Sequence, residues 1–375
     1  MKSICSGLYG VLFVFIILGL TSGCKVEKSF GLEPGYNKAE LLGIMPAMER
    51  AYDSEDIGGF KTPSPENMEQ VFRSKVSPLM NRFDIWLTND KKALITIRGT
   101  IIDSAAMSSA AVLYSLMAPA NGKIKVSETG WFEYKLTELP DAGVHLGMLL
   151  GLYFMSGELV DQINTQYRDG IKDFIIVGHS QGSGNSLLVT SYLWYLRKDG
   201  KLPSDIRFKT YSIATPKTGN LQYVYDYEKL TAGGYAISVN NVIDWVPRVP
   251  MTFQSIGDFP KVSPFKDIKE FLSGANYTLG PNFDKGFEDF SNVAPKVIDQ
   301  TTQGIHENVY PKIAKVMPGY VEPECLPSFN FERSGLSVPL VPDSEYYKLF
   351  PNDPENFNVW ENHSVYPYYI LIKSN

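Results

Sequence analysis

Apolar residues follow two different spacings along the chain, and the two alternate through its middle part. Apolar runs and alternating patterns predict strands at 82–88, 93–97, 172–177, 207–214 and 234–240. Helical spacing of apolar residues predicts helices at 37–55, 144–167 and 183–198. Residues 65–76 are predicted as a further helix, because Pro65 suits a first-turn position. Strands that alternate with helices predict an α/β domain with a mostly parallel central sheet flanked by helices.

The first residues have the pattern of a secretory signal peptide. A positive charge at Lys2 precedes an apolar run at 7–20 and small residues at 21–23. The next residue is Cys24, and this order resembles the bacterial lipoprotein signal. The resemblance implies cleavage after residue 23 and acylation of Cys24. An ordinary secretory signal stays the alternative, because Thr21 stands where the lipoprotein signal usually has leucine.

The rest of the chain is predicted to be a short tether and one domain. Residues 24–36 are polar and aperiodic, as expected of a flexible lipidated tether. Residues 37–375 are predicted as a single elaborated domain, in which 251–360 form an irregular elaboration. Small and flexible apolar residues at 103–118 fit both a core helix and a mobile lid. The signal places the protein in the bacterial cell envelope, lipid-anchored at the outer membrane or cell surface.

Composition and charge exclude several classes of function. The formal net charge is −6, and no run of Lys or Arg interrupts it, which argues against nucleic-acid binding. Membrane attachment would therefore depend on the acyl chains at Cys24. Cys5 leaves with the signal and Cys24 carries lipid, so Cys325 has no partner for a disulfide. No metal motif of the H-E-x-x-H type and no phosphate-binding loop occurs, so neither a metal nor a cofactor is expected.

The pentapeptide Gly178-His179-Ser180-Gln181-Gly182 has the pattern G-x-S-x-G and lies between a predicted strand and a predicted helix. In that context the motif indicates a nucleophile elbow, in which a sharp turn exposes the serine hydroxyl. Glycines on either side let the strand and helix backbones approach each other closely. Ser180 is therefore the candidate nucleophile of a serine hydrolase.

A serine nucleophile needs a histidine base and a carboxylate that orients it. On this type of scaffold the acid and then the histidine follow the serine along the chain. Asp244 comes just after a predicted apolar strand and is the candidate acid. Of the four histidines, only His306 and His363 lie beyond it. The residues alone leave both histidines open as the base.

Several segments together resemble the class 3 lipases, the fungal-lipase-like branch of the α/β-hydrolases. The similar segments occur in the family's order and are Ile97-Arg98-Gly99-Thr100, Val144-His145-Leu146-Gly147-Met148, Gly178 to Gly182, Thr215 to Asn220 and Asn241 to Pro250. The resemblance covers about residues 40–250 and implies an α/β-hydrolase fold. It also implies a lipase or esterase that acts on acyl-lipid esters through an acyl-enzyme.

The resemblance assigns roles to residues at the matching positions. It implies that Ser180 is the nucleophile and Asp244 the triad acid, with Thr100 and Gln181 at the two oxyanion-hole positions. His363 is favoured as the base, because the histidine, the serine and the aromatic cluster around it resemble the family's closing segment. His145 and His179 fall on positions that are not catalytic and are interpreted as structural.

Alternatives stay open on the sequence alone. Gln181 replaces the family's usual leucine, which keeps the backbone N–H but changes the pocket wall. A phospholipase and an esterase of polysaccharide acyl groups would use the same chemistry. A surface lipoprotein that keeps the fold as a non-catalytic binding module is the alternative from another class of function. The oligomeric state is not indicated.

Overall fold

The computed structural model describes residues 31–101, 107–275, 278–355 and 358–375. The chain divides into two units, Met1–Gly31 and Leu32–Asn375, and the description below concerns the second. The predicted signal peptide and Cys24 lie outside the described residues. Across the described ranges, no helix is both long enough and apolar enough to span a membrane.

A seven-stranded sheet forms the centre of the described part of the second unit. Its strands span, in spatial order, Met68–Arg73 (β1), Phe83–Thr88 (β2), Ala93–Ile97 (β3), Asp173–His179 (β8), Arg207–Ile213 (β9), Ala236–Asn241 (β10) and Leu336–Leu340 (β11). Each neighbouring pair among β3, β8, β9, β10 and β11 is parallel, whereas β1 and β2 form an antiparallel edge. The predicted mostly parallel sheet is therefore confirmed.

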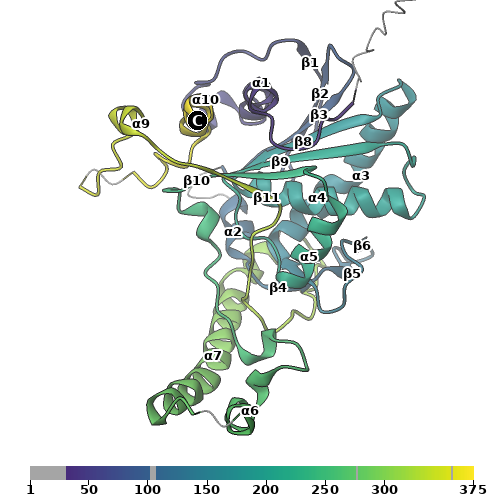
Figure 1. The fold of residues 1–375 in the computed structure, drawn as a ribbon. Helices are drawn as coiled ribbons and strands as arrows, with labels where there is room; N and C mark the ends of the chain where they lie inside the picture. Colours follow the sequence, from purple (N-terminus) through teal and green to yellow (C-terminus); the bar gives the residue numbers. More distant parts are fainter. Residues whose placement is uncertain (1–30, 102–106, 276–277, 356–357) are drawn as a thin grey trace, which may run out of the picture. The chain divides into compact units, whose positions relative to one another are not determined.

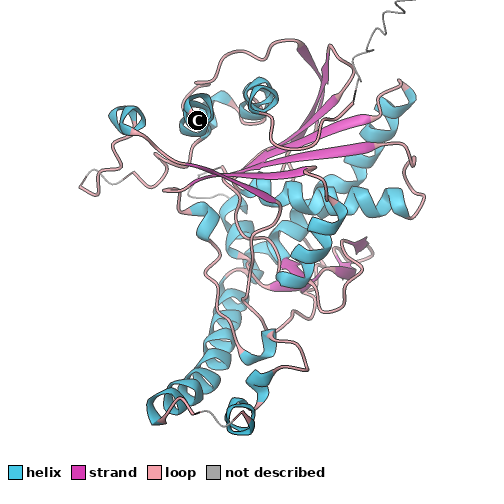
Figure 2. Ribbon diagram, viewed as in Figure 1, coloured by secondary structure: helices cyan, strands magenta, loops and turns pink. Residues whose placement is uncertain are grey.

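Helices cover both faces of this sheet, as Figures 1 and 2 show. Helices α1 (Lys38–Glu49) and α10 (Val365–Ser374) pack against each other on one face, and α3 (Leu146–Arg168) and α4 (Gln181–Lys198) pack together on the other. Strand β8 is buried along its whole length because both faces are covered. Its side chains alternate between the two cores: Ile175 lies in the α1 core and Ile176 in the α3 and α4 core.

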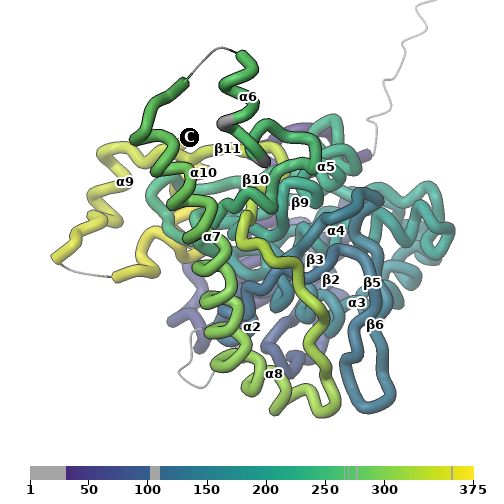
Figure 3. Tube along the Cα trace, turned by 90° about the horizontal axis from the view of Figure 1, so that it is seen from below, coloured from purple at the N-terminus to yellow at the C-terminus, as the bar shows by residue number. Residues whose placement is uncertain are grey.

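The remaining elements are shorter or lie at the periphery. The helices are α2 (Met107–Leu113), α5 (Leu221–Leu230), α6 (Ile268–Gly274), α7 (Pro281–Asn308), α8 (Tyr310–Val316) and α9 (Ser344–Leu349). Short 3₁₀ helices span Ser54–Ile57, Val246–Arg248, Ile256–Asp258 and Pro264–Lys266. Two small sheets pair β4 (Met117–Pro119) with β7 (Gly143–His145) and β5 (Asn121–Lys125) with β6 (Trp131–Lys135). In Figure 3, α7 leads into α8, and α8 contacts α2.

Two predictions of secondary structure were wrong. Residues 65–76 do not form a helix: they contain β1, which pairs with β2 as an antiparallel edge strand. Partner strands therefore overrode the local helix signal at Pro65. Residues 251–360 are less irregular than predicted, because they contain the 28-residue helix α7. α7 contains Pro295 and several Asn and Asp residues, which disfavour a helix locally, so the segment was not predicted as one.

The segment at 103–118 contains α2, but residues 102–106 lie outside the described residues. Ala110 and Ala111 are buried, whereas Leu113 is 61% exposed at the end of α2. A buried side and an exposed apolar residue fit a core helix and a lid alike, so both interpretations stay predictions.

Candidate active site

The turn from β8 into α4 presents Ser180 in a conformation that side chains rarely adopt. Ser180 has φ 59° and ψ −129°, and α4 begins at the next residue. A Cβ on Gly178 would lie 2.1 Å from the carbonyl oxygen of Gly182, and one on Gly182 would lie 2.2 Å from that of Ile97. Both glycines are therefore required by close backbone contact. The predicted arrangement of strand, tight turn and helix is confirmed.

Gly182→Ala should lower the free energy of unfolding by about 3 kcal/mol, since the new methyl group has to displace backbone atoms of β3. Gly157→Ala is the matched control, because Gly157 is also helical and a Cβ there meets no atom within 4 Å. That control should be slightly stabilising, as expected for Gly to Ala in a helix. Urea unfolding measures both variants. Equal midpoints for Gly182→Ala and the unmodified protein would contradict the packing argument.

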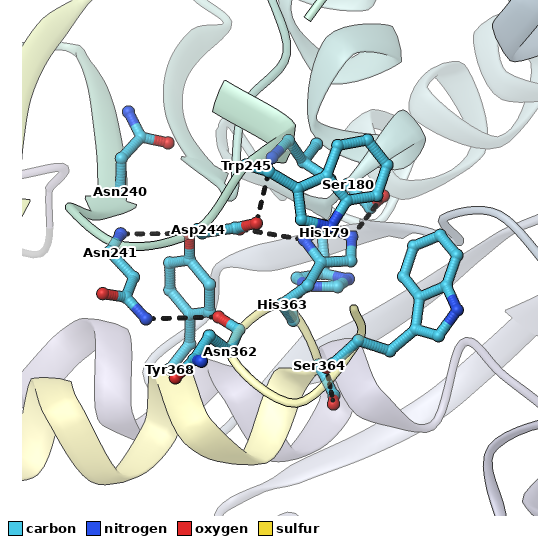
Figure 4. Close-up of polar contacts among 12 residues, drawn as sticks. His179, Ser180, Asn240, Asn241, Asp244, Trp245, Asn362, His363, Ser364 and Tyr368 are labelled. Carbon is cyan, nitrogen blue, oxygen red and sulfur yellow. Dashed lines mark hydrogen bonds and ion pairs between the residues drawn. The ribbon is translucent and has the colours of Figure 1, made fainter. Parts of the chain in front are cut away.

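Ser180, His363 and Asp244 form one hydrogen-bonded chain, shown in Figure 4. The distance from Ser180 Oγ to His363 Nε2 is 2.8 Å, and that from His363 Nδ1 to Asp244 Oδ2 is 2.9 Å. Ser180 comes from the elbow, Asp244 from the loop after β10, and His363 from the residues just before α10. All three are buried. The structure therefore brings together the three residues singled out in the sequence.

Asp244 accepts two further hydrogen bonds that hold its carboxylate in place. Its Oδ1 accepts from the backbone N–H of Val246 at 3.0 Å, and its Oδ2 accepts from the Tyr368 hydroxyl at 2.8 Å. Burial raises the pKa of Tyr368 well above its ordinary value, so the phenol keeps its proton and donates. The backbone N–H of Asn241 donates in turn to the Tyr368 oxygen at 3.0 Å.

Sequence reasoning did not find Tyr368. It lies on α10 five residues after His363, within a run of tyrosines that read only as an aromatic cluster. No spacing pattern indicated it, because His363 lies before α10 begins and residues five apart do not share a helix face.

His179 connects the elbow to the segment that carries His363. Its Nε2 donates to the carbonyl oxygen of His363 at 2.7 Å, so its neutral ring accepts at Nδ1 from the Tyr52 hydroxyl at 3.2 Å. Tyr52 also accepts from the backbone N–H of Gly99 at 3.0 Å. Burial, and secondarily the positive charge that His363 can carry, lowers the pKa of His179 to about 3. His179 thus holds the backbone of His363 and does not contact Ser180 Oγ through its ring.

His145 and His306 lie apart from the three-residue chain. His145 caps α3, accepting from the backbone N–H of Met148 at 3.4 Å, and its Nε2 lies 3.1 Å from the carbonyl oxygen of Val112. Burial lowers its pKa to about 4. His306 is on α7, 51% exposed, and its Nδ1 lies 2.8 Å from Glu322 Oε1. Neither histidine is positioned to act on Ser180.

Two buried neutral histidines should make the fold sensitive to acid. The pKa values of His145 and His179 are lower in the folded chain than the ordinary 6.5, so the unfolded chain binds more protons below pH 6.5. The contribution of the two neutral histidines to the free energy of unfolding is therefore fully present above pH 6.5. It is lost progressively as the pH falls towards their folded-state pKa values of about 4 and about 3. At pH 5 the expected loss is roughly 2 kcal/mol for each histidine. Urea unfolding at pH 7 and pH 5 measures it, and equal stability at the two values would refute the prediction.

Thr100 lies beside the elbow, and Gln181 belongs to it. A Cβ on Gly99 would come within 3.2 Å of Ser180 Cβ, so the end of β3 is in close contact with the serine. Gln181 is the first residue of α4, and its Oε1 accepts from the Thr100 hydroxyl at 3.3 Å. The two positions predicted for an oxyanion hole are thus adjacent to each other and to Ser180.

A cavity of about 460 Å³ opens beside this group. Its lining includes Ser180, His179, His363 and Thr100. Its volume lies in the range of small-molecule sites in proteins. In the part of the chain that the structure describes, no group of three or more His, Cys, Asp or Glu side chains is arranged to hold a metal ion.

Comparisons with known proteins agree with this geometry. Residues 94–254 match the family model described as Lipase (class 3), which supports the predicted resemblance to that family. A search of curated proteins found no match. The α/β-hydrolase fold is confirmed by the sheet order, the elbow and this family match.

Solved structures similar to this chain include three lipases. One is a fungal lipase–inhibitor complex, with 19% identity and a TM-score of 0.43 over 57% of this chain and 74% of that one. A lipase from Rhizopus microsporus var. chinensis has 18% identity and a TM-score of 0.41 over 57% and 69%. A Rhizomucor miehei lipase–propeptide complex has 17% identity and a TM-score of 0.43 over 61% and 72%.

Proposed function

We propose that this chain cleaves lipid esters through Ser180, His363 and Asp244. Its match to Lipase (class 3) supports a lipase-type carboxylic ester hydrolase with a serine triad. The observation that carries the proposal is the unbroken hydrogen-bond chain from Ser180 Oγ through His363 to Asp244. Residues up to 183 positions apart meet in the order that a serine hydrolase needs.

The reaction is acyl transfer to water. His363 Nε2 takes the proton as Ser180 Oγ attacks the ester carbonyl carbon, and the same nitrogen then gives the proton to the departing alcohol. Asp244 accepts a hydrogen bond from His363 Nδ1, which fixes the tautomer and stabilises the imidazolium. Water then attacks the acyl-enzyme with His363 again as the base, releasing the acid and restoring Ser180.

Negative charge on the carbonyl oxygen needs fixed donors nearby. The backbone N–H groups of Thr100 and Gln181 take this role in the proposal, and the start of α4 adds the positive end of its dipole. Loss of one such donor typically costs about 10²–10³ in kcat. The contact between the Thr100 hydroxyl and the Gln181 side chain holds the two positions together.

The proposed substrate is a lipid ester at a membrane, to which the chain is attached through acylated Cys24. The lipoprotein-like signal at 1–24 supports this attachment, and the proposed location is the bacterial cell envelope, at the outer membrane or cell surface. The formal net charge of −6 does not favour electrostatic binding to an anionic membrane, so in this proposal the acyl chains on Cys24 supply the anchoring.

Cys24→Ser should release the enzyme from membranes while its ester hydrolysis per molecule continues. Fractionation of cells, with mass spectrometry of the N-terminal peptide, measures both the location and the acyl mass. Cys325→Ser is the matched control and should stay with the membrane fraction. An unmodified Cys24 in the mature chain, or a soluble wild type, would refute the anchoring.

A fluorophosphonate probe tests the proposed chemistry directly, because it captures only an activated serine. The expected result is one adduct, located by mass spectrometry on Ser180 and absent in Ser180→Ala. Folded wild-type protein without an adduct would indicate the non-catalytic binding module instead. A substrate panel of emulsified triglyceride, phospholipid and acylated polysaccharide then identifies the class of ester that is hydrolysed fastest.

A further inference from the structure

The cavity beside Ser180 is enclosed mainly by segments outside the region that matches the lipase family. One wall comes from residues 49–61, which include the 3₁₀ helix at Ser54–Ile57, and the other from residues 349–350 and 358–367 around the start of α10. The family match covers 94–254 and contributes only Thr100, His179 and Ser180 to the lining. Most of the lining of this cavity therefore lies outside the family match.

The position of His363 indicates which half of an ester enters the cavity. In the tetrahedral intermediate, Ser180 Oγ and the leaving oxygen must both lie within reach of His363 Nε2, since this nitrogen protonates the alcohol. The acyl chain points away from the imidazole. The wall at 358–367 carries His363 itself, and the Trp360 ring in that wall lies with its centroid 5.7 Å from the imidazole centroid.

We propose that this cavity binds the alcohol half of the ester, and that it favours an uncharged, polyhydroxylated alcohol such as a glyceryl or glycosyl group. This inference rests on the proposed function, because it presupposes attack by Ser180. It adds a specificity site that residues 49–61, 349–350 and 358–367 form together.

The lining combines aromatic surfaces with hydrogen-bonding groups. Its aromatic members include Trp360, Phe350 and Tyr366, and the last two rings lie 6.2 Å apart between centroids. Polar side chains in the same lining include Asn358 and Lys61 as donors. Apolar ring faces beside hydrogen-bonding groups suit a molecule with C–H faces and hydroxyl edges. Polyols and sugars have this character, whereas a hydrocarbon chain has no hydroxyl group to bond with these side chains.

Charge in the lining argues against an alcohol that carries phosphate. Among the described lining residues, Lys61 is the one ammonium, and no arginine is present. Three carboxylates line the same cavity. Glu49 pairs with Arg50 at 3.0 Å, Asp56 lies 3.8 Å from Arg98, and Glu361 accepts from the backbone N–H of Asn352. Phosphate sites in proteins use clusters of Arg, Lys or backbone donors, and this lining has no excess of positive charge.

The experiment varies the alcohol while the acid stays the same. Methyl, glyceryl, glucosyl and glycerophosphoryl esters of hexanoic acid all form one hexanoyl-enzyme, so differences in kcat/KM report only the alcohol half. For wild type, the glyceryl or the glucosyl ester should exceed both the methyl and the glycerophosphoryl ester. The two neutral arms distinguish a glyceride from a sugar ester.

Leu349→Trp partly fills the cavity from a position that is 59% exposed, so the change does not disturb the core. It should lower the ratio of kcat/KM between the preferred polyol ester and the methyl ester by about tenfold, the scale of a small change in a substrate pocket. Leu336→Trp is the matched control, because Leu336 is 52% exposed on β11 and does not line the cavity. Its ratio should equal that of wild type.

Each outcome decides the inference. It is overturned if Leu349→Trp leaves the alcohol ratio unchanged but alters the preference among methyl butanoate, hexanoate and octanoate, because the cavity then holds the acyl chain. Fastest hydrolysis of the glycerophosphoryl ester also overturns it. Failure of the proposed function looks different: wild type then reacts neither with these esters nor with the fluorophosphonate probe.

Discussion

His363→Ala should reduce kcat/KM for a p-nitrophenyl ester by about 10⁴–10⁶, the range found when the base of a serine triad is removed. Ser180 Oγ has its hydrogen bond to His363 Nε2 at 2.8 Å, and without that nitrogen its proton has no acceptor during attack. The residual rate comes from the oxyanion donors and substrate binding. Initial rates at saturating and limiting ester concentrations measure kcat and KM separately.

His306→Ala is the control that makes this result specific. His306 is exposed on α7 and paired with Glu322, and it contacts none of Ser180, His363 and Asp244. Its removal should leave the rate within about twofold of wild type. Full activity of His363→Ala, together with an inactive His306→Ala, would transfer the role of base to His306 and contradict the geometry. Circular dichroism of both variants checks that each is folded.

Asp244→Asn should lower kcat by about 10⁴ with little change in KM. The carboxylate accepts hydrogen bonds from His363 Nδ1, from the backbone N–H of Val246 and from the Tyr368 hydroxyl. An amide has only one acceptor oxygen, so its NH₂ group must face one of these donors or force the imidazole into the other tautomer. In that tautomer Nε2 carries a hydrogen and no longer accepts the Ser180 proton.

Asp226→Asn is a suitable control for Asp244→Asn. Asp226 is also a buried aspartate that accepts from a tyrosine hydroxyl, here that of Tyr195, but it lies on α5 away from Ser180. Its folded fraction should keep a wild-type kcat. If Asp226→Asn lowers kcat as much as Asp244→Asn does, the loss reflects general destabilisation, and the specific role of Asp244 is wrong. Titration of active sites with the fluorophosphonate probe counts the competent molecules in each sample.

Local patterns were sufficient for the parallel sheet and the elbow. The apolar run before Gly178 belongs to a strand covered on both faces, and its composition reflects that burial. Close backbone contacts require the two glycines of the elbow. Gly178 is close to Gly182 in the same motif, and Gly182 is close to the neighbouring strand β3. The strand and the motif are each recognised within a short sequence window, although the contact of Gly182 with Ile97 joins residues that are far apart in the chain. The edge strand β1 was missed, because its extended form depends on pairing with β2.

The base and the residues that support it were harder to predict. Sequence order left His306 and His363 both possible, and only the resemblance to a family favoured His363. Tyr368 and the bonds that link Tyr52, His179 and the backbone of His363 gave no pattern in the sequence. Each of these contacts joins residues that come from different elements or different turns. The spacing of side chains within one element therefore does not predict these contacts.

The amino-acid sequence by itself determined the class of fold, the position of the nucleophile and the candidate acid, because these follow from burial periodicity and from glycines required by close contact. Only the tertiary structure decided which imidazole reaches Ser180, what holds Asp244 and which segments enclose the cavity. The physical reason is distance along the chain: these groups are up to 183 residues apart, and packing of α10 beside α1 brings them together.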